Sequence, residues 1–287
     1  PDADAVARAA AAAAIGAAAP GETMVIDGLA LPAFADTIDD AAGKLRCVAL
    51  IHHPLALETG IGPAARAHFA ALEPNLLAWI GRAIVTSGTT AAQVAAMGLA
   101  KDAIAVVEPG FDRARPMRSR RRGRPRLLCV ATITPRKGHL NAIAALRGLR
   151  ALPWRYLAVG SVTRHAPHAR RVRATVVAAR LAGRLRFIGE IPPTATSAHY
   201  ARADLFVLPS EHEGYGMAFA EAMAHGLAVV GARAGAVPDT VPAGAGPLVR
   251  PRDPKALRRA LRTMIASPRR RARASAVARA RSRAALV

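Results

Sequence analysis

Short runs of aliphatic residues alternate along the chain with longer alanine-rich stretches of helical spacing. Each aliphatic run is three to seven residues long, which is typical of buried strands in a parallel sheet. The runs lie at residues 24–26, 47–51, 83–87, 104–107, 126–132, 156–159, 185–188, 205–208 and 227–230. This β-α alternation predicts parallel sheets covered by helices on both faces.

The helical stretches between these strands have recognisable ends. They are expected at residues 9–19, where alanine dominates and the helix is weak, and at 89–97, 139–150, 168–182, 194–202 and 217–225. Gly226 follows the last of these, where a left-handed residue ends a helix well. One more helix begins at Asp253 and Pro254, an N-cap residue followed by a first-turn proline. Its apolar face carries Leu257, Leu261, Met264 and Ile265.

The alternation stops once, in a stretch of arginine, proline and glycine, and then restarts. Such a break indicates a linker between domains. We therefore predict an α/β protein of two Rossmann-like domains. The expected boundaries are an N-terminal domain at 1–112, a basic linker at 113–125, a C-terminal domain at 126–265 and a basic C-terminal tail at 266–287.

Positive charge is concentrated in two segments. The net charge is +22, residues 113–126 hold eight arginines and no acid, and residues 251–287 hold twelve Lys or Arg and one acid. Three interpretations stay open: a solvated and partly disordered charge run, attraction to an anionic membrane, and nucleic-acid binding. No aromatic residues interleave with the arginines for base stacking, so no nucleic-acid partner is expected.

Composition also bears on compartment and cofactors. Cys47 and Cys129 lie in apolar runs and are expected to be buried free thiols, which favours a reducing, cytoplasmic compartment. No stretch reaches the roughly 20 apolar residues that span a bilayer. No cluster of His, Cys, Asp and Glu has metal-ligand spacing, so neither a metal nor another cofactor is expected.

The most specific pattern is a pair of glutamates, Glu213 and Glu221, separated by seven residues. Gly214 and Gly216 lie between them, and a helix is expected to begin at Met217. A helix N-terminus binds anions through its free N–H groups, and glycine lets the backbone approach a ligand closely. Glu221, one turn into this helix, can accept hydrogen bonds from ribose hydroxyls. Glu213 can accept them from a transferred sugar.

A second, cationic loop follows the first strand of the C-terminal domain. It holds Arg136 and Lys137, between Pro135 and Gly138. At the carboxyl edge of a parallel sheet, two cations can neutralise the charge that grows on a nucleoside diphosphate leaving group. Together the two patterns predict a site for a nucleotide-sugar.

These motifs resemble those of retaining GT-B glycosyltransferases of family 4. The Glu-x7-Glu segment is similar to their donor-binding signature, residues 135–138 to their phosphate loop, and residues 107–112 to their interdomain hinge. The likeness covers about residues 45–265. It implies a metal-independent transferase that moves a hexosyl group, with retention, from a nucleotide-diphosphate sugar to an acceptor hydroxyl on a glycan or a lipid-linked molecule.

The resemblance also implies roles for single residues. Catalytic Glu213 contacts the donor sugar, and His52, just after the second strand, faces it from the other domain. Lys137 binds the diphosphate and Glu221 the ribose. The donor site is completed by Arg136, Gly214, Gly216 and Met217. No glycine-rich loop precedes His52, as it does in the family, so the N-terminal domain is expected to be truncated.

Two other functions stay open. A nucleotide-sugar 2-epimerase on the same fold would need catalytic acids in the first domain, where Glu58 and Glu73 are the candidates. A non-catalytic nucleotide-sugar-binding remnant is the other, because the first domain is short. The expected location is the cytoplasm, at the inner face of the membrane if the basic segments contact anionic lipid.

Overall fold

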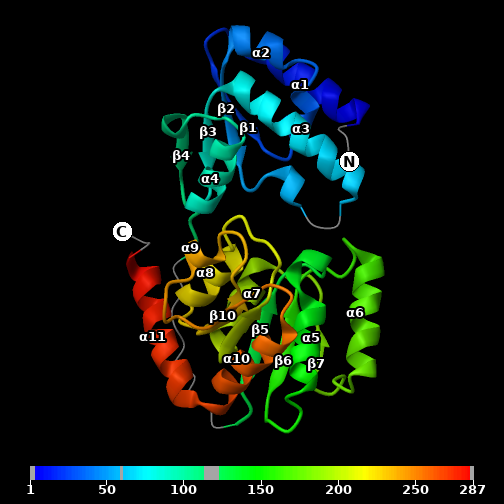
Figure 1. Ribbon diagram of the computed structural model, residues 1–287, viewed down its shortest axis with the longest axis vertical. Helices are drawn as coiled ribbons and strands as arrows, with labels where there is room; N and C mark the ends of the chain where they lie inside the picture. The colour runs from blue at the N-terminus through cyan, green and yellow to red at the C-terminus, as the bar shows by residue number, and fades with distance from the viewer. Residues whose placement is uncertain (1–3, 59–60, 113–122, 285–287) are drawn as a thin grey trace. The chain divides into compact units, whose positions relative to one another are not determined.

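Two separate parallel sheets organise the chain, one in residues 1–109 and one in residues 110–287 (Figure 1). The structure is a computed structural model that describes residues 4–58, 61–112 and 123–284. Strands alternate with helices in both units, which confirms the predicted α/β class. Residues 113–122 of the predicted basic linker lie outside the described residues.

The N-terminal unit has four parallel strands in the order β1-β2-β3-β4. These strands are β1 (Thr23–Asp27), β2 (Arg46–Ile51), β3 (Ala83–Val85) and β4 (Ile104–Val106). The helices are α1 (Ala5–Ala17), α2 (Ile38–Lys44), α3 (Pro63–Ile80) and α4 (Gly88–Ala96), with 3₁₀ turns η1 (Leu31–Phe34), η2 (Leu55–Leu57) and η3 (Lys101–Ala103). Ile26, Ala49 and Val85 of the strands belong to one buried apolar cluster, so this unit has a core of its own.

Helix α3 is the main element of this unit that the sequence pattern does not predict. It is 18 residues long and contains Pro74, a residue that normally interrupts a helix. Leu76, Leu77 and Ile80 on its last turns are buried in the core of the unit. Packing of this apolar end outweighs the local preference against a helix, and Gly81 ends it in the left-handed conformation.

The C-terminal unit has six parallel strands in the order β10-β9-β8-β5-β6-β7. They are β5 (Arg126–Val130), β6 (Arg155–Val159), β7 (Leu185–Phe187), β8 (Leu205–Leu208), β9 (Val229–Ala232) and β10 (Leu248–Val249). The helices are α5 (His139–Arg147), α6 (Ala166–Ala178), α7 (Pro193–Arg202), α8 (Met217–Ala224), α9 (Val237–Thr240), α10 (Pro254–Ala266) and α11 (Pro268–Ala284), with the 3₁₀ turn η4 (Pro135–Lys137).

The direction in which strands are added reverses in the middle of this sheet. From β5 the chain passes to β6 and β7 on one side, and then crosses to β8 on the other side of β5. The loops that follow β5 and β8 therefore begin at neighbouring carboxyl ends, and beyond them the chain continues toward opposite edges of the sheet. In open α/β sheets such a reversal leaves a crevice where ligands bind.

Three local predictions for this unit are confirmed. Asp253 caps α10, because its Oδ1 accepts the N–H of Ala256 at 2.8 Å. The four apolar residues predicted to share one face of this helix are all buried. Cys129 is a buried free thiol in β5, as is Cys47 in the N-terminal unit.

The basic segment predicted as a tail is largely helical. Helix α11 packs against α8, and its Ala274 and Ala278 are buried (Figure 1). Arg271 donates from Nη1 to the carbonyls of Met264 and Ile265, at 2.6 and 2.9 Å, and so satisfies the end of α10. Residues 268–284 are thus not a disordered charge run, because small alanine side chains let this helix pack closely.

Candidate functional site

Two loops meet at the carboxyl ends of β5 and β8. The first passes through η4 into α5, and the second runs from Pro209 to Gly216 and leads into α8. The N–H of Glu211 donates to the carbonyl of Arg136 at 2.7 Å. The Arg136 guanidinium donates in return to the carbonyl of His212 at 3.2 Å. The loops are therefore joined into one structure at the point where the sheet reverses.

Glycine is required where these loops touch. Gly138 has a φ of +69°, and a Cβ at this position would lie 2.0 Å from the carbonyl oxygen of Pro209. Gly235 is similar, since its Cβ would lie 2.2 Å from the carbonyl oxygen of Glu213. Real Cβ atoms do not approach oxygen so closely, and positive φ is costly for other residues. These two glycines fix the backbone on either side of Glu213.

Glu213 lies at the centre of the site and is only 6% exposed. Its two carboxylate oxygens lie 2.8 and 2.9 Å from Lys137 Nζ, and Oε2 lies 3.6 Å from the Arg136 guanidinium. Ser210 Oγ donates to Oε1. The cation predicted to bind phosphate and the acid predicted to bind sugar are thus hydrogen-bonded to each other. A buried carboxylate held in this way fixes Lys137 at the crevice.

Glu221 is held by a different partner. It lies on α8, and its Oε2 accepts a hydrogen bond from Tyr200 Oη of α7 at 2.9 Å. Burial raises the pKa of Tyr200 well above its usual value, so the phenol remains a donor. The Tyr200 ring also stacks on His225, with ring centroids 5.0 Å apart. This arrangement orients the Glu221 carboxylate from the side of α7.

Two helices begin at this edge of the sheet. Gly138 is the N-cap of α5 and Gly216, with a φ of +95°, is the N-cap of α8. Neither glycine supplies a side-chain acceptor, so the first-turn N–H groups of both helices lack a side-chain cap. Two positive helix ends together with Arg136 and Lys137 make a site suited to a diphosphate.

The predicted site residues fall in both units. Most of them lie around the carboxyl ends of β5 and β8 in the C-terminal unit: Arg136, Lys137, Glu213, Gly214, Gly216, Met217 and Glu221. His52 belongs to the N-terminal unit, at the end of β2. It is half exposed, and its Nε2 lies 3.1 Å from Asp27 Oδ2.

The two acids considered for an epimerase have structural partners. Glu73 is buried and accepts the N–H groups of Leu55 and Ala56, at 2.7 and 3.1 Å, so it caps the 3₁₀ turn η2. Burial raises the pKa of Glu73, and these two backbone bonds oppose that rise. Glu58 lies 2.9 Å from His53 Nε2. These contacts explain both acids without a catalytic role.

Several residues of the site are not evident from the sequence pattern. Tyr200 and Ser210 lie in segments that flank β8, and their hydrogen bonds to the two glutamates are seen only in the fold. Thr240 Oγ1 donates to the carbonyl of Tyr215 and so supports the loop from behind. His139 is buried at the start of α5, and burial lowers its pKa to about 4, so its ring is neutral near pH 7. The sequence signal for Tyr200 and Ser210 is that they are polar residues close to the predicted strand at 205–208.

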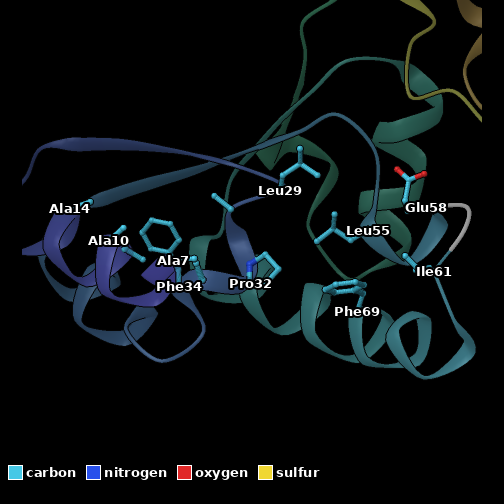
Figure 2. Close-up of a pocket in the computed structure, with 13 residues that line it drawn as sticks. Ala7, Ala10, Ala14, Leu29, Pro32, Phe34, Leu55, Glu58, Ile61 and Phe69 are labelled. Atoms are coloured by element: carbon cyan, nitrogen blue, oxygen red, sulfur yellow. The ribbon is translucent and has the colours of Figure 1, made fainter. Parts of the chain in front are cut away.

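An apolar groove of about 550 Å³ lies in the N-terminal unit (Figure 2). Ala10 and Ala14 of α1 line it together with Phe34 of η1. Figure 2 shows Phe69 of α3 below Leu55, on the side of the groove away from the α1 alanines. Its walls are almost entirely hydrocarbon, which suits a ligand with an aliphatic portion.

The described part of the chain has neither a metal-binding cluster nor a helix that could span a membrane. Within residues 4–58, 61–112 and 123–284, no group of three or more His, Cys, Asp or Glu side chains could hold a metal ion. Among the same residues, no helix has the length and apolar character needed to cross a bilayer.

The sequence is similar to known transferases. The profile of the glycosyl transferases group 1 family matches residues 111–281. The lipopolysaccharide core biosynthesis mannosyltransferase LpcC of Rhizobium leguminosarum bv. viciae is 36% identical over 152 residues, which are 51% of this chain and 42% of that protein. A GDP-mannose-dependent alpha-(1-6)-phosphatidylinositol monomannoside mannosyltransferase of Mycolicibacterium smegmatis is 33% identical over 158 residues, 52% of this chain and 41% of the relative. The matched part spans less than half of either relative.

Solved structures share their fold with nearly the whole chain. Sucrose-phosphate synthase from Thermosynechococcus elongatus has a TM-score of 0.79 at 22% identity, covering 91% of this chain and 69% of that one. Anabaena Alr3699/HepE, solved in complex with UDP and glucose, has a TM-score of 0.79 at 20% identity, covering 96% and 76%. At such identities the likeness establishes the fold, and it confirms the predicted architecture of two Rossmann-like domains.

The close approach at Gly138 makes a testable prediction. Gly138→Ala should lower the free energy of unfolding by about 2 kcal/mol or more, because it adds a strained φ and a clash with Pro209. Gly183→Ala is the matched control, since its Cβ meets no atom within 4 Å, and it should change stability by less than about 0.5 kcal/mol. Urea unfolding measures both. Equal effects at the two positions would contradict the tight contact between the loops.

Proposed function

The chain belongs to the glycosyl transferases group 1 family, and on that premise we propose that it is a hexosyltransferase with a nucleotide-diphosphate sugar as donor. One observation carries the proposal. Lys137, Arg136 and Glu213 form a compact ionic cluster at the reversal point of the sheet, between the N-termini of α5 and α8. Such a cluster offers positive charge to a diphosphate and a carboxylate to sugar hydroxyls.

The donor is held through three kinds of contact in this proposal. Lys137, Arg136 and the first N–H groups of α8 at Met217 bind the diphosphate, and Gly214 and Gly216 let it approach the backbone. Glu221, oriented by Tyr200, accepts hydrogen bonds from the ribose hydroxyls. Glu213 keeps Lys137 in place, and its carboxylate oxygens also accept hydrogen bonds from the sugar hydroxyls. The contacts of Glu213 and Glu221 in the structure support this division of roles.

We propose transfer with retention at the anomeric carbon. The bond from this carbon to the diphosphate breaks, and the acceptor oxygen forms its new bond on the same face. The acceptor proton passes to a phosphate oxygen of the departing nucleoside diphosphate, so no enzymic nucleophile is needed. Lys137 and Arg136 stabilise the charge on the leaving group without a metal ion. His52, whose Nε2 lies 3.1 Å from Asp27 Oδ2, is the residue of the N-terminal unit that we propose as a contact of the transferred sugar.

The acceptor proposed is a lipid-linked molecule whose aliphatic portion occupies the apolar groove. The relatives support this choice, because the name of one refers to phosphatidylinositol monomannoside and that of another to the lipopolysaccharide core. The groove supports it because Phe34, Leu55 and Phe69 would be poorly covered by a glycan alone.

We also propose that the C-terminal unit contacts anionic membrane. Exposed cations follow the outward faces of α10 and α11, namely Lys255, Arg258, Arg259, Arg262, Arg269, Arg270 and Arg273. Each cation near such a surface contributes about 1 kcal/mol of attraction. A lipid-linked acceptor would be met at that surface.

The transferase proposal is tested with donor and lipid extract. Radiolabelled GDP-mannose, UDP-glucose and other donors are incubated with the 287-residue chain and membrane lipids. We expect label in the lipid fraction with one donor, and an anomeric configuration by NMR that matches the donor. Donor binding without any transfer would contradict the enzyme and favour a binding remnant, while an inverted product would contradict retention.

Variants of the two glutamates are the controls for this test. Glu221→Ala should weaken nucleoside diphosphate binding about tenfold, the loss expected for hydrogen bonds to a charged group. Glu213→Ala should lower turnover far more than nucleoside diphosphate affinity, because it removes a sugar contact and the support of Lys137. Calorimetry and initial rates separate the two effects. Equal loss of affinity and turnover in both variants would contradict the division of roles.

The groove makes a separate prediction. Ala14→Gln introduces an amide into the apolar wall and should raise KM for the lipid-linked acceptor about tenfold, with KM for the donor unchanged. Ala13→Gln is the matched control, because Ala13 is exposed on the same helix and does not line the groove. Identical acceptor KM values in the two variants would rule the groove out as the lipid site.

The membrane proposal predicts binding that depends on salt. The chain should co-sediment with phosphatidylglycerol vesicles at low ionic strength and dissociate as salt rises, since the Debye length is about 10 Å at 0.1 M. Arg258→Gln with Arg262→Gln should weaken this binding, as both residues are exposed on α10. If the chain does not bind these vesicles at low salt, the proposed contact with anionic membrane is wrong.

A further inference from the structure

A second groove of the C-terminal unit lies at the amino ends of its strands, opposite the edge that carries the donor site. Its volume is about 380 Å³, within the range of small-molecule sites. Basic side chains from three neighbouring strands and from α7 line it: Arg126, Arg155, Arg184, Arg186, Arg202 and His199. Neither the glycosyltransferase site nor the family likeness accounts for this concentration of arginine.

The register of the sheet places these arginines side by side. Arg126 of β5 pairs directly with Arg155 of β6. Tyr156 pairs with Leu185, so Arg155 lies beside Arg184, one step earlier along both strands. Neighbouring strands are only about 4.8 Å apart, and like charges in adjacent positions are destabilising. Three adjacent arginines in one row thus repel one another, and a bound anion would reduce this repulsion.

The partners of these side chains differ. Arg184 has a structural role, since it donates to the carbonyl of Leu152 at 2.8 Å and lies over the ring of Trp154. Within the described residues, the guanidinium groups of Arg126, Arg155, Arg186 and Arg202 have no carboxylate partner. The neighbouring acid, Asp204, uses its Oδ2 to accept the backbone N–H of Arg126 at 2.8 Å.

We propose that this groove binds a small polyanion that carries phosphate groups, at a site separate from the nucleotide-sugar site. Arginine suits such a ligand because its planar guanidinium donates two parallel hydrogen bonds to phosphate oxygens. Arg126 and Arg155 of this row, together with Arg186 of β7, which pairs with Leu157 of β6, offer several such forks from rigid strands. The half-buried Leu157, which pairs with Arg186 and also lines the groove, provides an apolar floor for a ligand with a small organic part.

Inorganic pyrophosphate is the probe for this site. Its apparent affinity is measured from the rise in melting temperature of the whole chain, with the double variant Arg155→Gln, Arg186→Gln beside the wild type. We expect the double variant to bind pyrophosphate at least about tenfold more weakly at this site. Without pyrophosphate it should melt no lower than the wild type, because repulsion along the row is relieved. Arg173→Gln, an exposed change on α6 outside the groove, should respond like the wild type.

Pyrophosphate also suits the donor site, so Lys137→Ala is measured in parallel. The proposal expects two separable responses, one lost in the arginine double variant and one in Lys137→Ala. It is overturned if the double variant responds like the wild type, or if Lys137→Ala alone abolishes the whole response. Vesicles of phosphatidylglycerol test a lipid headgroup as the source of phosphate. Vesicle binding that the double variant loses while its pyrophosphate response is intact would also overturn the proposal.

Discussion

The ion pair between Lys137 and Glu213 is the interaction on which the organisation of the donor site depends. Its two residues lie in loops that follow different strands, and they meet only because β5 and β8 are neighbours. Both carboxylate oxygens contact the ammonium group, and Glu213 is almost completely buried. Removal of Lys137 would leave the buried carboxylate of Glu213 with only Ser210 and the more distant Arg136 as partners, which is more costly than loss of a surface pair. The pair therefore fixes the distance between the loop that follows β5 and the loop that follows β8.

Backbone geometry reinforces this constraint. Gly138 and Gly235 permit contacts that no other residue allows, and each lies against the loop that carries Glu213. The same loops supply the N-caps of α5 and α8, so the ion pair and the two helix ends are positioned together. In the proposed function, an incoming diphosphate would meet cations and helix N-termini that are already positioned. Such preorganisation is the main source of electrostatic stabilisation in enzymes.

Much of this arrangement was predictable from local sequence, and the rest depends on long-range packing. The strand runs, the cap at Asp253 and the glutamate pattern are local signals, and they located both loops correctly. The contact of Lys137 with Glu213 requires knowing that β8 returns beside β5, which no local pattern states. The contact of Tyr200 with Glu221 could not be predicted for the same reason, because it arises from the packing of α7 against α8. Helix α3 was not predicted because it contains a proline, and residues 268–284 were expected to be a basic tail because a run of charge obscures the buried alanines of α11.

The contact between α11 and α8 has a consequence for how the protein is made. Helix α8 carries Glu221 and borders the diphosphate site, yet part of its surface is covered by residues 268–284. A ribosome delivers α8 some fifty residues before it delivers α11. During that interval α8 has an uncovered apolar surface, while the loop at residues 135–138 has already been synthesised. The surface of α8 is thus covered only once α11 has been synthesised, and a polypeptide that lacks α11 would be exposed to chaperones and proteases at this helix.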